Sequence, residues 1–261
     1  MSFDELLDLA ASLGYEGVDD GFGYALENGP DAYLGLTAKF DVYTSIWGHG
    51  VEWRTDEDTF RAGMATLPER AKIAAEIGCF RTCDWIMPAV EGDAMEAITT
   101  WKRRWKELAA VLGEYNHRLG LEFVGPRHIR VGKNSTIWRM DQLLDIEAEL
   151  GEPNLGLLLD SFHWFNAEHN VADLEALTNE KIVHVHLNDA PKRSLDDQQD
   201  FERMAPGEGI IDLVGFLGAL QKIGYDGYMG VEIFSEELKA MSNEDAAARV
   251  KNGYDKLMEK V

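Results

Sequence analysis

Basic residues are scarce in this chain: 25 Lys and Arg stand against 47 Asp and Glu, which gives a formal net charge of −22 over 261 residues. Such a surface repels phosphate backbones and therefore argues against DNA or RNA as a partner. The acidic excess suits solubility or tolerance of salt, and it carries no information about the fold.

Cysteine is almost absent. The two cysteines, Cys79 and Cys83, lie in the stretch CFRTCDW. Two cysteines cannot build a disulfide framework, and no second pair completes a four-ligand zinc site. We therefore expect two buried thiols on a strand, in a protein of the reducing cytoplasm.

Long apolar runs and flexible linkers are also missing. Although 45% of the residues are hydrophobic, no stretch reaches the roughly 18 apolar residues of a membrane span. Residues 1–17 carry early acids and no basic region ahead of an apolar core, unlike a secretory signal. No Pro/Gly/Ser-rich linker interrupts the chain, so we expect residues 1–261 to form one domain.

What the chain does have is a regular alternation of short β-rich runs with longer stretches of helical periodicity. The expected strands are residues 15–22, 41–51, 80–90, 121–126, 155–162, 181–190 and 228–234. The expected helices are residues 3–14, 59–78, 95–120, 138–151, 173–179, 212–224 and 243–259. This order, with short connections, predicts an α/β fold: a (β/α) TIM-type barrel with a parallel sheet inside and helices outside.

The alternation yields seven strands, whereas a closed barrel of this type has eight and opens with a strand. Here the first element is the helix at residues 3–14. We therefore expect the first strand to be lacking and the barrel wall to be open or distorted between residues 15–22 and 228–234. The gap could instead close by tightening, be covered by a partner in a homo-oligomer, or reflect a shortened form of a longer protein.

Four expected strands end in polar residues that a core does not favour. They are Glu122 in LEFVG, Asp160 in LLLDSFH, His186 in HVHLND and Glu232 in GVEIF. The carboxyl ends of parallel barrel strands meet at one face, so these side chains can converge there. Gly120 and Gly230 share strand faces with the two glutamates and are expected to leave room beneath the site.

Each of these residues alone has an ordinary explanation. A strand-end acid is usually a helix cap or a solvated loop residue, and a strand histidine usually belongs to the core. Four on four successive expected strands favour a metal site instead, because three crowded carboxylates repel one another unless a cation joins them. One imidazole and three carboxylates suit a single divalent ion: manganese, magnesium, cobalt or zinc.

Other candidates follow the strands. His184 shares a strand face with His186 and is expected to support the site or to belong to the core. His49 in SIWGHGVEW and Trp85 in CDWIMPA are candidates for substrate binding. An aromatic wall suits a sugar ring, whereas Trp at a strand end more often packs, as Trp47 and Trp53 can also do.

Two loops also need an interpretation. The stretch GPRHIR places Arg127, His128 and Arg130 beside Glu122, where they could recognise substrate oxygen atoms or pair with surface acids. The stretch APGEG, residues 205–209, is a loop stiffened by Pro and Gly. It is not a phosphate cradle, because no G-x-G-x-x-G opens a helix after a strand.

The stretches LEFVGP, NLGLLLDSFHWF, KIVHVHLNDA and APGEGIIDLVGFLGALQKIGYDGYMGVEIF resemble the sugar isomerase/epimerase family with the xylose-isomerase-like barrel. The resemblance covers roughly residues 115–261 in the family's order and spacing, and over residues 1–110 only the strand–helix rhythm matches. Within that family the chain resembles isomerases of 2-keto-myo-inositol (inosose).

The resemblance implies roles for individual residues. It makes Glu122, Asp160, His186 and Glu232 the metal ligands and the two glutamates the proton-transfer pair. It also implies that His163, in an Asp-x-x-His pattern, contacts substrate and that Arg203, just before APGEG, lies near the substrate pocket.

The expected chemistry is isomerisation or epimerisation of a small polyhydroxy ketone, a sugar or cyclitol. A proton next to a carbonyl is removed and returned by carboxylates, while the metal stabilises the enediolate oxygen. Alternatives on the same site are a lyase, either a dehydratase of inosose or dehydroshikimate or an enzyme of C-glycoside cleavage. A non-catalytic sugar-binding subunit is a further alternative, which predicts a missing ligand.

Overall fold

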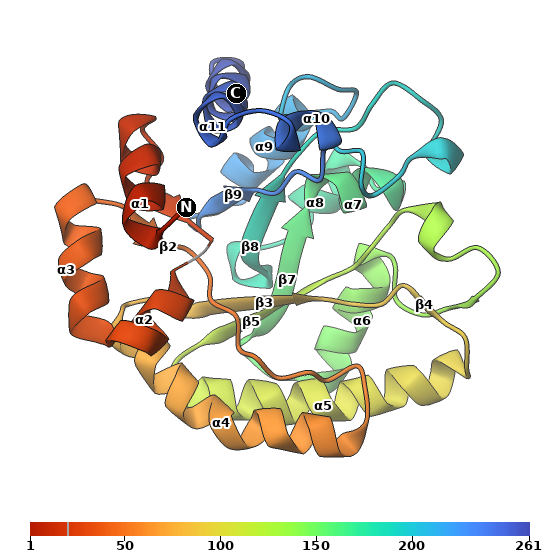
Figure 1. Ribbon diagram of the computed structural model, residues 1–261. Coiled ribbons are helices and arrows are strands. Elements are labelled where there is room, and N and C mark those ends of the chain that lie inside the picture. The colour runs from red at the N-terminus through yellow and green to blue at the C-terminus, as the bar shows by residue number, and fades with distance from the viewer. Residues whose placement is uncertain (20) are drawn as a thin grey trace.

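The structure is a computed structural model that describes residues 1–19 and 21–261, with strands curled about an axis and helices outside them (Figure 1). The helices are α1 (Phe3–Ser12), α2 (Phe22–Asn28), α3 (Pro30–Phe40), α4 (Glu57–Glu76), α5 (Ala94–Glu114), α6 (Met140–Leu150), α7 (Ser161–Asn166), α8 (Val171–Glu175), α9 (Leu213–Lys222), α10 (Glu236–Lys239) and α11 (Asn243–Met258). The strands are β1 (Gly17–Val18), β2 (Tyr43–Thr44), β3 (Arg81–Trp85), β4 (Ala89–Val90), β5 (Arg118–Glu122), β6 (Asn134–Ser135), β7 (Leu155–Asp160), β8 (Ile182–Leu187) and β9 (Met229–Val231).

The main sheet is parallel and runs in the order β3-β5-β7-β8-β9. Strands β1 and β2 form a separate parallel pair, and a bridge between Trp47 and Thr82 connects the segment after β2 to β3. These seven parallel strands therefore follow one another in chain order, as the strand–helix alternation predicts for a barrel wall. Strands β4 and β6 form a short antiparallel ribbon outside it.

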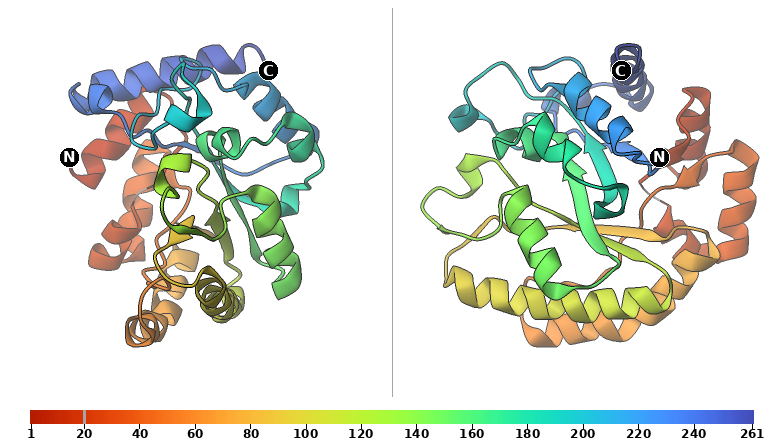
Figure 2. Two further views of the ribbon diagram at one scale, coloured as in Figure 1. Left: turned by 90° about the vertical axis from the view of Figure 1, so that its right-hand side faces the viewer. Right: turned by 180° about the vertical axis from the view of Figure 1, so that it is seen from behind.

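The barrel wall is open between β1 and β9. Within residues 1–19 and 21–261, no strand pairs with the outer edge of either one, which confirms the expected open wall. Other contacts span the opening. The Tyr15 hydroxyl donates to the Ala247 carbonyl at 3.0 Å, so the segment after α1 is tied to α11, and these two helices lie side by side (Figure 2).

The core forms where the sequence is most continuously apolar. All six residues of β7 and all six of β8 are buried, as expected for strands covered on both sides. Trp47 and Trp53 are almost fully buried, and the Trp53 ring packs edge-on against Trp101 and Trp105. Packing is therefore the role of Trp47 and Trp53. None of the described helices combines the length and the apolar character needed to cross a membrane.

The structure corrects the expected helix at residues 95–120. Helix α5 ends at Glu114, and Asn116 has a left-handed φ of 62° that breaks the helical path. Strand β5 then begins at Arg118, inside the expected helix. Helices α2 and α3, between the first two strands, have no counterpart among the expected elements.

The expectation that two glycines leave room beneath the site is also wrong. A Cβ atom on Gly120 would lie 2.7 Å from the Cys83 sulfur, and one on Gly230 would lie 2.2 Å from Oδ2 of Asp19. Neighbouring side chains fill both spaces, because interiors pack closely. The glycines therefore admit Cys83 and Asp19 instead of leaving a void.

Candidate functional site

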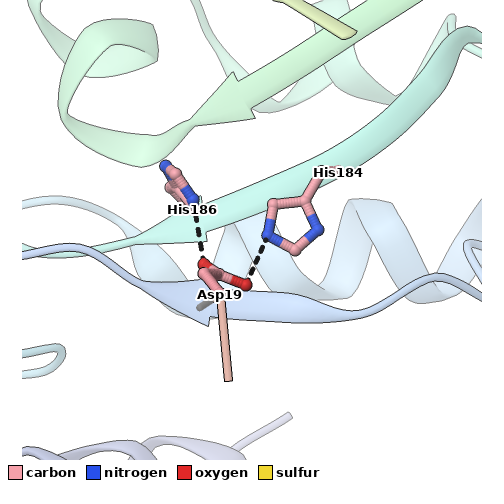
Figure 3. Close-up of side chains that lie close together, drawn as sticks. All are labelled: Asp19, His184 and His186. Atoms are coloured by element: carbon pink, nitrogen blue, oxygen red, sulfur yellow. Dashed lines mark hydrogen bonds and ion pairs between the residues drawn. The ribbon is translucent and has the colours of Figure 1, made fainter. Parts of the chain in front are cut away.

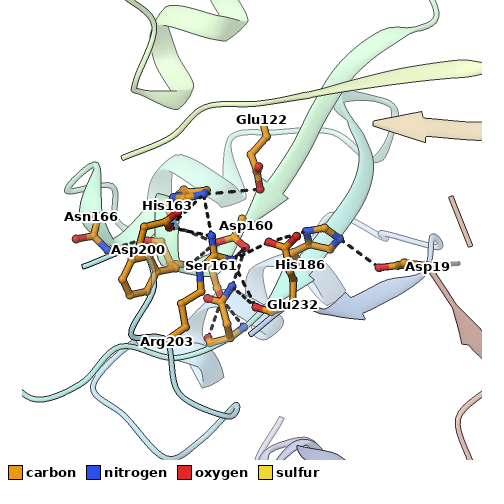
Figure 4. A network of polar contacts seen from close by, with 12 residues as sticks. Asp19, Glu122, Asp160, Ser161, His163, Asn166, His186, Asp200, Arg203 and Glu232 are labelled. Atoms are coloured by element: carbon orange, nitrogen blue, oxygen red, sulfur yellow. Dashed lines mark hydrogen bonds and ion pairs between the residues drawn. The ribbon is translucent and has the colours of Figure 1, made fainter. Parts of the chain in front are cut away.

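Strand register brings the four expected strand-end residues together. Asp160 on β7 pairs with His186 on β8, and His186 pairs in turn with Gly230 on β9. Glu122 ends β5, and Glu232 follows β9 directly. The candidate ligand atoms of Glu122, Asp160, His186 and Glu232 all lie within 4.8 Å of one another (Figure 4). We call these residues the four-residue cluster.

Asp160 has two functions in the structure. Its Oδ1 atom caps α7 by accepting the backbone N–H groups of Phe162 at 2.7 Å and His163 at 3.0 Å. Its Oδ2 atom accepts the side-chain amide of Asn188 at 2.7 Å. Asp160 is thus both the N-cap of α7 and a member of the four-residue cluster, because α7 begins immediately after β7.

Arg203 joins the cluster from the loop before residues 205–209. Its Nη1 atom lies 2.8 Å from Oε2 of Glu232 and 3.2 Å from Oδ2 of Asp160. Its Nη2 atom donates to Oδ1 of Asp200 at 2.9 Å and to Nε2 of His163 at 3.3 Å. The structure therefore places both residues that the family resemblance singled out beside the cluster.

Two buried atoms of the cluster have no hydrogen-bond partner among the described residues: Oε1 of Glu122 and Nδ1 of His186. Oε1 of Glu122 lies 3.9 Å from Nε2 of His163, and Nδ1 of His186 lies 3.8 Å from Oε2 of Glu232. Buried polar atoms are rarely left unsatisfied. An oxygen and a nitrogen of this kind at one point are a donor set that accepts a divalent cation.

The environment moves the pKa values of the carboxyl groups apart. Burial, and next the charge of Asp160, raises the pKa of Glu122 well above its ordinary range. Burial would also raise the pKa of Asp160, but Arg203 and the nearby histidines hold it below its ordinary value. Without a cation, the protein groups therefore favour an ionised Asp160 and a protonated Glu122. A bound cation would favour the ionised form of Glu122 as well.

The pKa values of the two histidines also diverge. Burial lowers the pKa of His163 to about 4, with Arg203 adding to the effect and Asp160 opposing it. Burial also disfavours the charged form of His186, but a hydrogen bond to Asp19 and the nearby carboxylates raise its pKa to about 9. His163 is therefore a neutral hydrogen-bonding group, and His186 is strongly basic in this acidic surrounding.

The two expected substrate-binding residues of the early strands lie in different surroundings. Trp85 pairs with Glu122 in the β3–β5 register, on the same strand face, and is 47% exposed. Its ring stacks on the guanidinium of Arg54 at 4.6 Å. His49 is buried, and its Nε2 atom lies 3.4 Å from Oδ2 of Asp84. Trp85 thus flanks the cluster, whereas His49 supports Asp84.

The stretch after β5 makes local contacts. Arg127 forms an ion pair with Asp196, and Nδ1 of His128 lies 3.1 Å from the Gln198 carbonyl. The Arg130 guanidinium stacks on Trp138 at 3.6 Å. The Arg127 contact matches the expected pairing with surface acids, whereas His128 and Arg130 contact a backbone carbonyl and an aromatic ring.

The APGEG loop is built around a carboxylate of the protein itself. Asp189 accepts the backbone N–H groups of Gly207 at 3.1 Å, Gly209 at 2.8 Å and Ile211 at 2.9 Å. The loop amides are therefore occupied internally, and the loop fixes the chain that follows Arg203.

Sequence reasoning missed four polar residues of this region: Asp19, Ser161, Asn188 and Asp200. Asp19 follows the first strand in VDD and carries the same strand-end signal as the four-residue cluster. Asn188 lies two residues after His186, on the same strand face by alternation. Asp200 has no distinguishing signal in the acidic stretch DDQQDFE.

The profile of a family described as "Xylose isomerase-like TIM barrel" matches residues 7–257. Inosose isomerase of Bacillus velezensis is 30% identical over 59% of this chain and 53% of its own length, and inosose isomerase of Halalkalibacterium halodurans is 32% identical over 56% and 50%. 3-Dehydroshikimate dehydratase of Pseudomonas putida is 30% identical over 50% of this chain and 22% of its own length. The chain thus spans about half the length of the first curated relatives it matches.

Solved structures share the architecture over the whole chain. A xylose isomerase domain protein of Alicyclobacillus acidocaldarius superposes with a TM-score of 0.92 at 30% identity, covering 100% of this chain and 94% of its own. A protein named IOLI, solved with a zinc atom bound, has a TM-score of 0.83 at 22% identity, with the same coverage. The second likeness concerns the fold alone.

Proposed function

The chain belongs to the xylose isomerase-like TIM barrel family, and from this premise we propose that it is a divalent-metal-dependent isomerase or epimerase. Its proposed substrate is a small polyhydroxy ketone, with 2-keto-myo-inositol as the first candidate. The observation that carries the proposal is the convergence of Glu122, Asp160, His186 and Glu232 within 4.8 Å of one another.

The four residues fit a divalent cation. Three carboxylates and one imidazole offer hard oxygen donors and one nitrogen, which suit manganese, magnesium, cobalt or zinc. The unpartnered Oε1 of Glu122 and Nδ1 of His186 are the atoms that such an ion would satisfy. The zinc atom bound to the IOLI protein, a relative in fold, also supports a divalent ion here.

The proposed chemistry is proton transfer beside a carbonyl group. A bound cation would polarise that carbonyl and lower the cost of negative charge on its oxygen. Glu122 and Glu232 come from β5 and the end of β9, two strands that are not neighbours in the sheet. One glutamate can take the proton from the carbon, and the other can return it at the adjacent carbon or on the opposite face.

Three other residues have proposed roles in holding the substrate. Arg203 forms ion pairs with Asp160 and Glu232, which orient both carboxylates, and it contributes positive charge at the site. His163, neutral at ordinary pH because its pKa is lowered to about 4, can donate to or accept from a hydroxyl group. The exposed Trp85 beside Glu122 offers an apolar face to a sugar or cyclitol ring. His49 contributes indirectly, through Asp84.

The names of the relatives support a keto-inositol as substrate, because several curated relatives are inosose isomerases. A relative named ketose 3-epimerase, from Arthrobacter globiformis, is 26% identical over 80% of this chain. A panel of keto-inositols and ketoses therefore covers the proposed substrate class.

A dehydratase is the second candidate function, because two relatives are named 3-dehydroshikimate dehydratase. Such an enzyme would use the same cluster and the same first proton removal, and would then expel a hydroxyl group instead of returning the proton. The two functions differ only in the fate of the enolate.

Metal analysis combined with solvent deuterium exchange tests the proposal. The purified protein should bind one divalent ion per chain and should catalyse deuterium incorporation into a keto-inositol or ketose. A gain in ultraviolet absorbance from an enone would assign the dehydratase instead. A protein that binds no divalent ion, or that exchanges no proton of any substrate in the panel, would refute the proposal.

A further inference from the structure

Three polar side chains meet at the open wall of the barrel (Figure 3), and Asp19 lies on the side of His186 away from Asp160 (Figure 4). Asp19 comes from the end of β1, and His184 and His186 come from β8. Only His186 belongs to both groups, so it is the link between the cluster and Asp19.

The two ring nitrogens of His186 face different partners. Nε2–H donates to Oδ2 of Asp19 at 3.2 Å, and Nδ1 lies 3.8 Å from Oε2 of Glu232 on the cluster side. A cation that binds His186 takes the place of one ring proton, so the bound imidazole is neutral and carries its remaining proton on the other nitrogen. Because an ionised carboxylate can only accept, the Asp19 contact favours that proton on Nε2 and leaves Nδ1 as the nitrogen for the cation.

Asp19 is itself held in place from several sides. The Ser45 hydroxyl donates to its Oδ1 atom, and Nε2 of His184 lies 3.5 Å from the same atom. Gly230 lies against its other oxygen, since a Cβ atom at position 230 would be only 2.2 Å from Oδ2. Although the Asp19 side chain is 31% exposed, its orientation is fixed by Ser45, which follows β2, and by residues of β8 and β9.

We propose that Asp19 is a positioning residue, which fixes the tautomer and ring orientation of His186 so that Nδ1 serves the cation. The inference rests on the proposed function, because it presupposes a cation in the four-residue cluster. A carboxylate behind a metal-binding histidine orients the ring and raises its basicity, and its loss costs about 10–100-fold in metal affinity.

The experiment measures zinc affinity by competition with a chromophoric chelator and reads the His186 nitrogens by ¹⁵N NMR of the zinc-loaded protein. Native protein should bind one zinc per chain through Nδ1, with the proton on Nε2. Asp19→Ala should weaken zinc binding about 10–100-fold and should change the ¹⁵N shift of Nε2, because the hydrogen bond from Nε2–H to the carboxylate is lost. Asp19→Asn should lose less, because its amide oxygen can still accept the Nε2 proton.

A second variant disturbs the contact between Asp19 and His186 without removing the carboxylate. Gly230→Ala would place a methyl group where Oδ2 of Asp19 lies, so it should displace Asp19 and weaken zinc binding in the same direction. Asp8→Asn, on the exposed face of α1, removes one negative charge away from the site and should leave zinc affinity unchanged.

Three results would overturn the inference. If Asp19→Ala and Gly230→Ala bind zinc like the native protein through Nδ1, Asp19 does not position His186, and the proposed function is unaffected. If native protein binds two zinc ions and Asp19→Ala binds one, a cation and not a proton lies between Asp19 and the histidines. If native protein binds no zinc, manganese, magnesium or cobalt, the proposed function fails and the inference fails with it.

Discussion

Nη1 of Arg203 lies 3.2 Å from Oδ2 of Asp160, and both side chains are almost completely buried. A buried ion pair is costly to break, because removal of one partner leaves the other charge uncompensated. This ion pair therefore stabilises the fold, and it also lies directly beside the candidate metal site, because Asp160 belongs to the four-residue cluster.

Arg203→Met should destabilise the metal-free protein by about 3–5 kcal/mol, because it leaves the buried carboxylate of Asp160 without its positively charged partner. A saturating divalent ion should recover part of that loss, since the ion supplies positive charge to the same carboxylate. Urea unfolding with and without manganese measures both effects.

Arg249→Met is the matched control for this prediction. Arg249 also pairs with two carboxylates, Glu208 and Glu237, but its side chain is 30% exposed. Its loss should cost no more than about 1 kcal/mol, as is typical of surface ion pairs. If both substitutions lower the free energy of unfolding equally, the buried Arg203 pair contributes no more to stability than a surface ion pair.

Glu232→Gln should lower substrate deuterium exchange by about 10²–10⁴-fold, because an amide cannot accept the proton, and should leave some metal bound. Asp160→Ala should lose the metal first, since it removes a proposed ligand that also caps α7. Metal content and exchange are measured on the same samples. If Glu232→Gln exchanges substrate protons at the native rate, Glu232 is not the base. Glu236→Gln, at an exposed residue, is the control.

Trp85→Ala should raise KM about tenfold with little change in metal content. The reasoning is that loss of roughly 1.5 kcal/mol of apolar contact with a substrate ring weakens binding by that factor. Trp85→Phe should retain most of the affinity. Met95→Ala, at a residue that is 69% exposed, serves as the control. If steady-state kinetics show the same KM for Trp85→Ala and for this control, Trp85 does not contact the substrate.

His117 gives the protein a defined sensitivity to acid. Burial lowers its pKa, and its Nε2–H donates to the Ala71 carbonyl at 2.7 Å. A histidine with a depressed folded pKa contributes stability that is present above the unfolded pKa of about 6.5 and is lost as the pH falls through the folded value. The free energy of unfolding should therefore decrease as the pH is lowered below about 6.5.

His117→Gln tests this assignment, because glutamine can still donate to Ala71 but does not titrate. The variant should show a shallower pH dependence of the unfolding free energy between about pH 6.5 and 4.5. An unchanged slope would assign the acid sensitivity to other groups, such as the buried His163.

Local sequence was sufficient for the architecture. Leucine-rich runs such as residues 155–160 predict strands buried on both faces, because no other short element accommodates continuous apolar side chains. Polar residues at the ends of those strands, such as Asp160 and Glu232, predict a shared site, because parallel strands end at one face. Both inferences depend only on strand period and direction.

Boundaries and close contacts depended on the tertiary structure. Only the fold shows that the left-handed Asn116 separates α5 from β5, and that Cys83 fills the space beside Gly120. Such details follow from three-dimensional packing, which a periodic pattern does not encode.

The clearest case is Asp19, which lies 167 positions before His186 in the sequence and yet accepts its Nε2 proton. The sequence by itself determined that strands and helices alternate and that four ionisable residues end four strands, because these properties are local. The partner of His186 was decided by the curl of the sheet, which brings β1 across the open wall to β8 and β9. A contact of this kind arises only when the whole barrel packs, so only the tertiary structure could reveal it.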